Sequence, residues 1–166
     1  MRILGIDPGS RNTGLGIIDH EVNKETLVAA ETLRLGGGPI PERLSAIFDG
    51  VQAIINTYQP DVMAIETVFM NRDAQAAIKL GQARGAAICA AAQMNLEVHE
   101  YAPRLIKQAV VGRGGADKVQ IQHMVRVLLG VKQKISADAF DALAVALCHA
   151  HTAQTASRLP AGVTLR

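Results

Sequence analysis

The spacing of the apolar residues changes at residues 36–39, and this change constrains the fold more than any other feature of the chain. Before it, short apolar runs between brief polar connections predict strands at 2–7, 13–18 and 26–35. Connections this short join antiparallel neighbours. After it, apolar residues recur at helical spacing over 41–58, until Pro60 ends the pattern. The opening of the chain therefore predicts an antiparallel meander followed by a helix.

The rest of the chain alternates between strand and helix patterns. Strands are predicted at 61–66 and 97–101, and helices at 73–94, 103–111, 116–129 and 136–150. Asp73 and Ser136 are candidate N-caps. No linker interrupts residues 1–152, which we expect to form one domain, with 153–166 as a flexible C-terminal tail. The fold class is α/β, with a mixed five-stranded sheet flanked by helices.

Positive charge is concentrated in one block of the chain. The net charge is only +2, but residues 104–134 hold seven basic side chains and one acidic side chain. Such a block is either a solvated face or a binding surface for a polyanion. Aromatic residues make up 3% of the chain, which argues against a module that binds nucleic acid mainly by stacking bases.

Two further features concern location. The uncharged runs fall short of the ~20 apolar residues that a membrane span needs, and no basic-then-apolar leader follows Met1. Cys89 and Cys148 stand singly, with neither a disulfide framework nor zinc-ligand spacing. We therefore expect a cytoplasmic protein without a membrane partner.

Four carboxylates occupy positions that local structure does not explain. Asp7 and Glu66 each end a predicted strand, and Asp138 and Asp141 share one face of the last predicted helix. Asp7 could instead stabilise its turn, and Asp138 its helix dipole, whereas glutamate neither caps well nor favours strands. If the four converge, hard divalent ions such as Mg²⁺ or Mn²⁺ would offset their repulsion. A pair of such ions can promote phosphodiester hydrolysis.

Several segments in register resemble the RuvC family of bacterial Holliday-junction resolvases, which have a ribonuclease H-like fold. The segments are 5–14, 64–69, 79–85, 107–120 and 138–144. The resemblance runs in order from about residue 2 to residue 152. It implies a structure-specific endonuclease of recombination and DNA repair, which nicks opposing strands of a four-way junction as a homodimer and leaves 5′-phosphate ends. It also implies the RuvA–RuvB branch-migration complex as a partner.

The resemblance also assigns site residues. It implies a metal site formed by Asp7, Glu66, Asp138 and Asp141, which binds two Mg²⁺ ions or Mn²⁺ in their place. Lys107 and Lys118 correspond to the family's basic residues near the third helix.

Two loops are further candidates for DNA binding. The segment 112–118, which contains Arg113 and Lys118, lacks the ending of a Walker A sequence. It is either a plain entry to a helix or a loop that offers backbone N–H groups to DNA phosphates. Phe69, in the loop after Glu66, either packs in the core or stacks on an unpaired base of the junction.

Three other functions remain open. An actin-like or sugar-kinase ATPase also begins with the pattern of residues 5–9, but it needs two lobes, for which 166 residues are too few. A catalytically inactive junction-binding protein would have no use for four acids, which only destabilise a fold without a cation. A nuclease for RNA–DNA hybrids would share the fold. ATP binding, absence of cleavage and substrate preference distinguish the three.

Overall fold

A single mixed sheet forms the centre of the computed structural model, which describes residues 1–22, 24–68 and 73–158. Its strands are β1 (Arg2–Asp7), β2 (Asn12–Glu21), β3 (Lys24–Arg34), β4 (Val62–Glu66) and β5 (Glu97–Tyr101). They lie in the order β3-β2-β1-β4-β5. The first three strands are antiparallel, and β4 and β5 run parallel to β1. The predicted α/β class and five-stranded mixed sheet are therefore confirmed.

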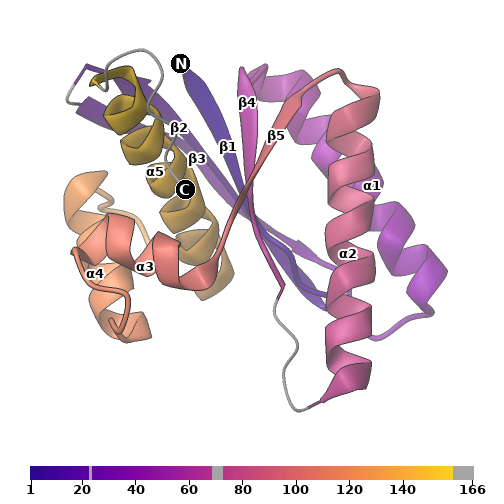
Figure 1. Cartoon of the computed structure of the whole chain (residues 1–166). Coiled ribbons are helices and arrows are strands. Elements are labelled where there is room, and N and C mark those ends of the chain that lie inside the picture. Colours follow the sequence, from indigo (N-terminus) through magenta and orange to yellow (C-terminus); the bar gives the residue numbers. More distant parts are fainter. Residues whose placement is uncertain (23, 69–72, 159–166) are drawn as a thin grey trace.

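Helices cover both faces of the sheet (Figure 1). The helices are α1 (Ile40–Tyr58), α2 (Ala74–Gln93), α3 (Pro103–Val111), α4 (Lys118–Leu128) and α5 (Ala137–Arg158). The first two lie on one face, and the last three on the other, each layer with its own hydrophobic core. α5 packs directly on β1 and β2, and α3 and α4 pack against α5. α5 is buried nearly all round over 139–150, as expected for the central helix of a layer.

The strands follow from their residue pattern. β1 and β4 are apolar at successive positions, which suits central strands that are covered on both faces. α2 turns a stripe of small side chains towards the core, formed by Ala83, Ala87, Ala90 and Ala91. Its N-terminus is capped as predicted, because the Asp73 side chain accepts a hydrogen bond from the Ala76 backbone N–H at 3.1 Å.

The boundaries that differ from the sequence prediction by two or more residues lie at the β2–β3 hairpin, at the start of α4 and at the end of α5. The β2–β3 strands continue to Glu21 and from Lys24, so their hairpin connection is shorter than predicted. α4 begins at Lys118 rather than at residue 116, because Asp117 and Gln120 form a reciprocal capping box. α5 continues to Arg158, beyond its predicted end at residue 150. Within the three described ranges, no helix is long and apolar enough to cross a membrane.

Candidate active site

The alternation of side chains along β1 and β4 brings two carboxylates together. Ile6 and Ile65 are neighbours in the parallel pair, and both belong to the core on the α1–α2 side. Because successive side chains point to opposite faces, the next residues, Asp7 and Glu66, face the α5 side. Both strands end here, so the two carboxylates lie side by side at the carboxyl ends of β1 and β4.

The first turn of α5 brings the other two. Ser136 caps this helix as predicted, since its Oγ accepts a hydrogen bond from the Ala139 backbone N–H at 3.1 Å. The same hydroxyl pairs with Thr32 Oγ1 at 2.5 Å, which ties the start of α5 to β3. Asp138 and Asp141 follow immediately and are both partly exposed. The first turn of α5 thus brings Asp138 and Asp141 near enough to the ends of β1 and β4 to act electrostatically on Asp7.

Glycines in the sheet allow α5 to come this close. Gly14 is the β2 partner of Asp7, and a Cβ on it would lie 2.0 Å from the Asp138 carbonyl oxygen. A Cβ on Gly5 would lie 2.1 Å from the Ala142 carbonyl oxygen. Neither distance is physically possible, so only glycine permits the approach. The role of these two glycines was not predicted, although glycine inside a strand is itself a sign of close backbone approach.

The acids act on one another electrostatically. Burial, followed by the charge of Glu66 and then of Asp141 and Asp138, raises the pKa of Asp7 to about 8. Burial also raises the pKa of Glu66; the charge of Asp141 adds to this rise, while nearby Lys107 opposes it. The cluster is therefore unstable as four bare anions, and added positive charge would stabilise it.

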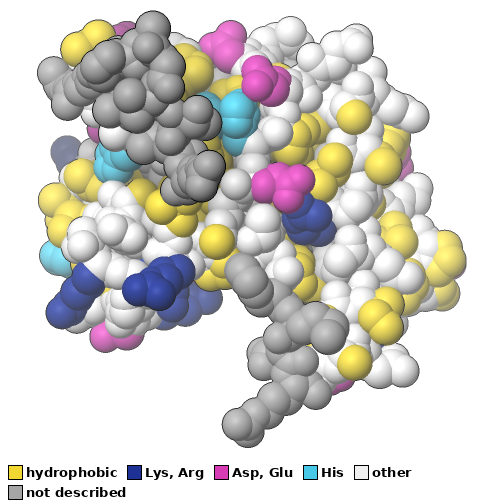
Figure 2. Space-filling view, viewed as in Figure 1, with side chains coloured by type: hydrophobic (Ala, Val, Ile, Leu, Met, Phe, Trp, Pro, Cys, Tyr) yellow, Lys and Arg dark blue, Asp and Glu magenta, His cyan; other side chains and the backbone are white. Residues whose placement is uncertain are grey.

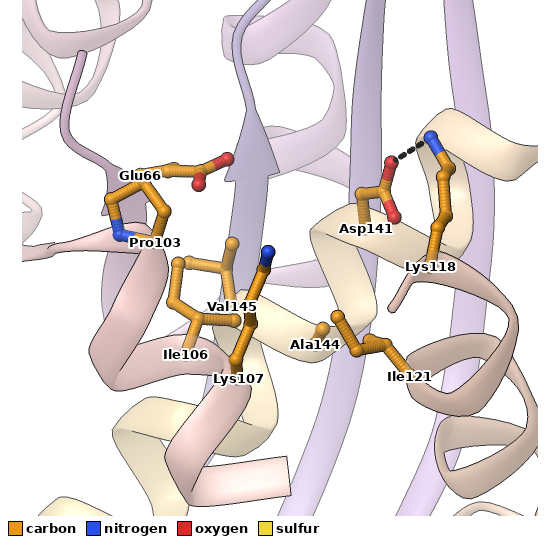
Figure 3. Close-up of a pocket in the computed structure, with 9 residues that line it drawn as sticks. All are labelled: Glu66, Pro103, Ile106, Lys107, Lys118, Ile121, Asp141, Ala144 and Val145. Atoms are coloured by element: carbon orange, nitrogen blue, oxygen red, sulfur yellow. Dashed lines mark hydrogen bonds and ion pairs between the residues drawn. The ribbon is translucent and has the colours of Figure 1, made fainter. Parts of the chain in front are cut away.

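Two lysines supply part of that charge. Lys118, the first residue of α4, donates a hydrogen bond to Asp141 Oδ2 at 2.7 Å, and this contact raises the pKa of the lysine. Lys107 comes from α3. Figure 3 shows its ammonium group directed towards the gap between the carboxylates of Glu66 and Asp141. All four side chains line one pocket of about 200 Å³.

The donor set fits a hard divalent cation. In the described part of the chain, no three Asp, Glu, His or Cys side chains are close enough, as they stand, to hold a metal ion. However, the four converging acids offer only oxygen atoms, which Mg²⁺ prefers over the nitrogen and sulfur ligands typical of zinc. The raised pKa values of Asp7 and Glu66 indicate a site where a cation would relieve repulsion.

The remaining predicted site residues lie apart from this pocket or outside the described residues. Arg113 is exposed in the loop between α3 and α4 and does not line the pocket. Phe69 falls outside the described residues. Figure 2 shows Lys and Arg side chains gathered over the α3–α4 region at the lower left. One member of the basic block has an internal role, because Arg126 donates to the Val131 carbonyl at 2.9 Å.

Comparison with known proteins gives a consistent family. The family model described as crossover junction endodeoxyribonuclease RuvC matches residues 3–149. The protein of that name from Methylococcus capsulatus is 54% identical over 158 residues, which cover 95% of each chain. A structure of Thermus thermophilus RuvC in complex with a Holliday junction substrate superposes with a TM-score of 0.88 at 34% identity, covering 95% of this chain and 97% of that one. A yeast mitochondrial Holliday junction resolvase shares the fold, with a TM-score of 0.66 at 9% identity, over 93% of this chain and 82% of that chain.

Proposed function

The chain belongs to the RuvC family of crossover junction endodeoxyribonucleases, and from this premise we propose that it resolves Holliday junctions by nicking two opposing strands. The observation that carries the proposal is the convergence of Asp7, Glu66, Asp138 and Asp141 beside two lysines. Its cellular role would be the completion of homologous recombination and DNA repair, in the cytoplasm.

The four acids would hold Mg²⁺, two ions per site, with Mn²⁺ as a substitute. Asp7 and Glu66 would bind from the ends of β1 and β4, and Asp138 and Asp141 from α5. Bound ions of this kind activate a water molecule and stabilise the leaving oxygen of a phosphodiester. The oxygen-only donor set and the mutual repulsion of the acids support this assignment.

The basic side chains would position the DNA. Lys118 already neutralises Asp141, and its side chain is more than half exposed, so it can exchange that contact for a DNA phosphate. Lys107 would serve the same strand from α3. Arg113, in the exposed loop, would contact a phosphate further away, and Phe69 would stack on an unpaired base of the junction.

The outer face of α2 supports a homodimer. Ile78 is 61% exposed there, and a Cβ on Gly81 or Gly85 would meet nothing within 4 Å. Figure 2 shows hydrophobic side chains exposed over this helix. A four-way junction has near-twofold symmetry, which a C2 dimer matches. Within the cell, the RuvA–RuvB complex implied by the family would deliver the junction to this dimer.

Substrate preference tests the proposed function against its rivals. The protein is incubated with Mg²⁺ and a synthetic four-way junction, a linear duplex of the same sequence or an RNA–DNA hybrid. We expect paired nicks in the junction, with 5′-phosphate and 3′-hydroxyl ends, and at most slow cleavage of the other two substrates. Preferential cleavage of the hybrid, or binding of the junction without cleavage, would support a rival function instead.

A further inference from the structure

A cleft lined by three cations lies on the α1–α2 side of the sheet, the side opposite Lys107 and Lys118. We infer that this cleft, which contains Arg11, Arg43 and Lys79, binds a backbone phosphate of the same DNA strand that crosses the acidic cluster. The inference rests on the proposed function, because it names a further contact for the DNA substrate. The cleft belongs to the α1–α2 side of the molecule, whereas the two lysines come from α3 and α4.

Three separate elements build the cleft, which has a volume of about 450 Å³. Arg11 lies in the turn after β1, four residues beyond Asp7. Arg43 comes from α1, and its Nη1 donates to the Ser10 carbonyl at 2.7 Å, which fixes the guanidinium against that turn. Lys79 is exposed on α2. The cations therefore converge from distant parts of the sequence on one concave surface.

These cations are available for a ligand. Among the residues that the structure describes, none of the three forms an ion pair, so no carboxylate neutralises their charges. A phosphate oxygen is a strong hydrogen-bond acceptor for a guanidinium or an ammonium group. The first turn of α2 also lines the cleft, and the partial positive charge of a helix N-terminus favours an anion.

One acid lines the cleft and opposes an anion there. Asp73 caps α2 through its hydrogen bond from Ala76, and its negative charge would weaken phosphate binding without blocking it. Asparagine at this position would keep the cap and remove the charge, since both residues accept the same hydrogen bond. Asp73→Asn is therefore expected to tighten DNA binding, whereas removal of a cation from the cleft is expected to weaken it.

The cleft continues from the acidic cluster. Glu66 lines both the lysine pocket and a small pocket that also contains Asp7 and Leu80. Leu80 in turn lines the basic cleft. The pocket that contains Asp7 and Glu66 and the basic cleft therefore adjoin the same side chain, so a DNA strand that crosses the carboxylates could continue over α2 into the cleft. This continuity favours a phosphodiester of DNA over a free nucleotide or phosphate as the ligand.

Binding of an intact four-way junction in EDTA, measured by fluorescence anisotropy over a range of salt concentrations, tests the inference. Arg11→Gln and Lys79→Gln should each weaken binding by about three- to tenfold and reduce the log–log salt slope by about 1. Asp73→Asn should tighten binding. The matched control is Lys24→Gln, which removes an exposed lysine at the β2–β3 hairpin and should change neither quantity.

A chemical probe locates the phosphate. One uncharged methylphosphonate linkage is moved nucleotide by nucleotide along the strand away from the crossover. At one position it should weaken wild-type binding but not weaken Lys79→Gln further, because both changes remove the same contact. Wild-type affinity and salt slope in both Arg11→Gln and Lys79→Gln would overturn the inference. Cleavage of the junction by the wild type with Mg²⁺, measured separately, would show that the proposed function stands in that case.

Discussion

At the scale of single residues, the site depends on glycines, which have no side chain, as much as on the acids. The acids can be recognised from the sequence, because Asp7 and Glu66 end apolar strands and Asp138 follows a capping serine. The glycines opposite α5 could not be identified in the same way. Their role depends on which helix lies on β1 and β2, and strand patterns alone do not specify that packing.

Gly14→Ala tests this role. The added methyl group would overlap the Asp138 carbonyl, so α5 must shift away from the sheet or β2 must distort. Overpacking of this kind costs roughly 1–3 kcal/mol, or about 2–10 °C in melting temperature for a chain of this size. We expect thermal melts to show this loss, together with slower junction cleavage because Asp138 is displaced. Gly37→Ala, where a Cβ would meet nothing within 4 Å, is the control. Equal melting temperatures for the two variants would show that the close approach is not constraining.

At the scale of secondary structure, the ends of some helices depend on capping contacts that the spacing of apolar residues does not show. The ranges 97–101 and 103–111 were predicted to the residue, since the first ends near Pro103 and the second ends at Gly112 with φ of 79°. The start of α4 was missed because Ala116 is apolar and fits the helical spacing, while the Asp117 cap decides where the helix begins. The length of α5 was missed because its last turns lack an apolar stripe.

α5 also contains a buried histidine, far along the helix from the acids. The Tyr101 hydroxyl lies 2.8 Å from His149 Nδ1, and the His99 ring lies 4.6 Å away, centroid to centroid. Burial, with a contribution from the charge of His99, lowers the pKa of His149 to about 4, although Glu97 acts in the opposite direction. His20 adds to the lowering. The fold therefore requires the neutral imidazole.

This requirement predicts how stability depends on pH. In the unfolded chain the imidazole titrates near its ordinary pKa of 6.5, so the unfolded state binds the proton first as pH falls. The contribution of His149 to the free energy of unfolding should be fully present above about pH 6.5 and should be lost progressively as the pH falls towards 4. Urea unfolding at several pH values should show that, over this pH range, the free energy of unfolding falls by roughly 1–3 kcal/mol less in His149→Phe than in the wild type. Parallel pH profiles for the two proteins would contradict the assignment.

At the scale of the whole molecule, the outer face of α2 is the surface that we propose for the homodimer. Its alanine stripe is buried, but its outer face forms the wall of a groove of about 510 Å³ that also contains Arg84 and Glu100, which form an ion pair. The sequence of α2 is consistent with a second buried face, because its apolar residues cover more than one stripe of the helix. The partner surface itself could not be predicted from one sequence.

Light scattering at micromolar concentration tests the dimer. We expect a mass of twice 17.6 kDa for the wild type and a single chain's mass for Ile78→Glu, because a charge would be buried at the interface. Val22→Glu, at a residue that is 86% exposed in the β2–β3 hairpin, should remain dimeric. A wild type that is monomeric under these conditions would remove the basis for paired nicking by a preformed dimer.

We propose that the four carboxylates where the sheet meets α5 hold the cations that cleave the DNA. The most direct measurement compares junction cleavage with Mg²⁺ and junction binding in EDTA for the wild type, Asp7→Asn, Glu66→Gln and Glu21→Gln. Glu21→Gln removes an exposed acid at the end of β2 and serves as the matched control. We expect the first two variants to bind the junction as tightly as the wild type but to cleave it about 100-fold more slowly or worse, since cation binding needs the lost charge. Cleavage at the wild-type rate by Asp7→Asn and Glu66→Gln would contradict the assignment of these carboxylates as cation ligands.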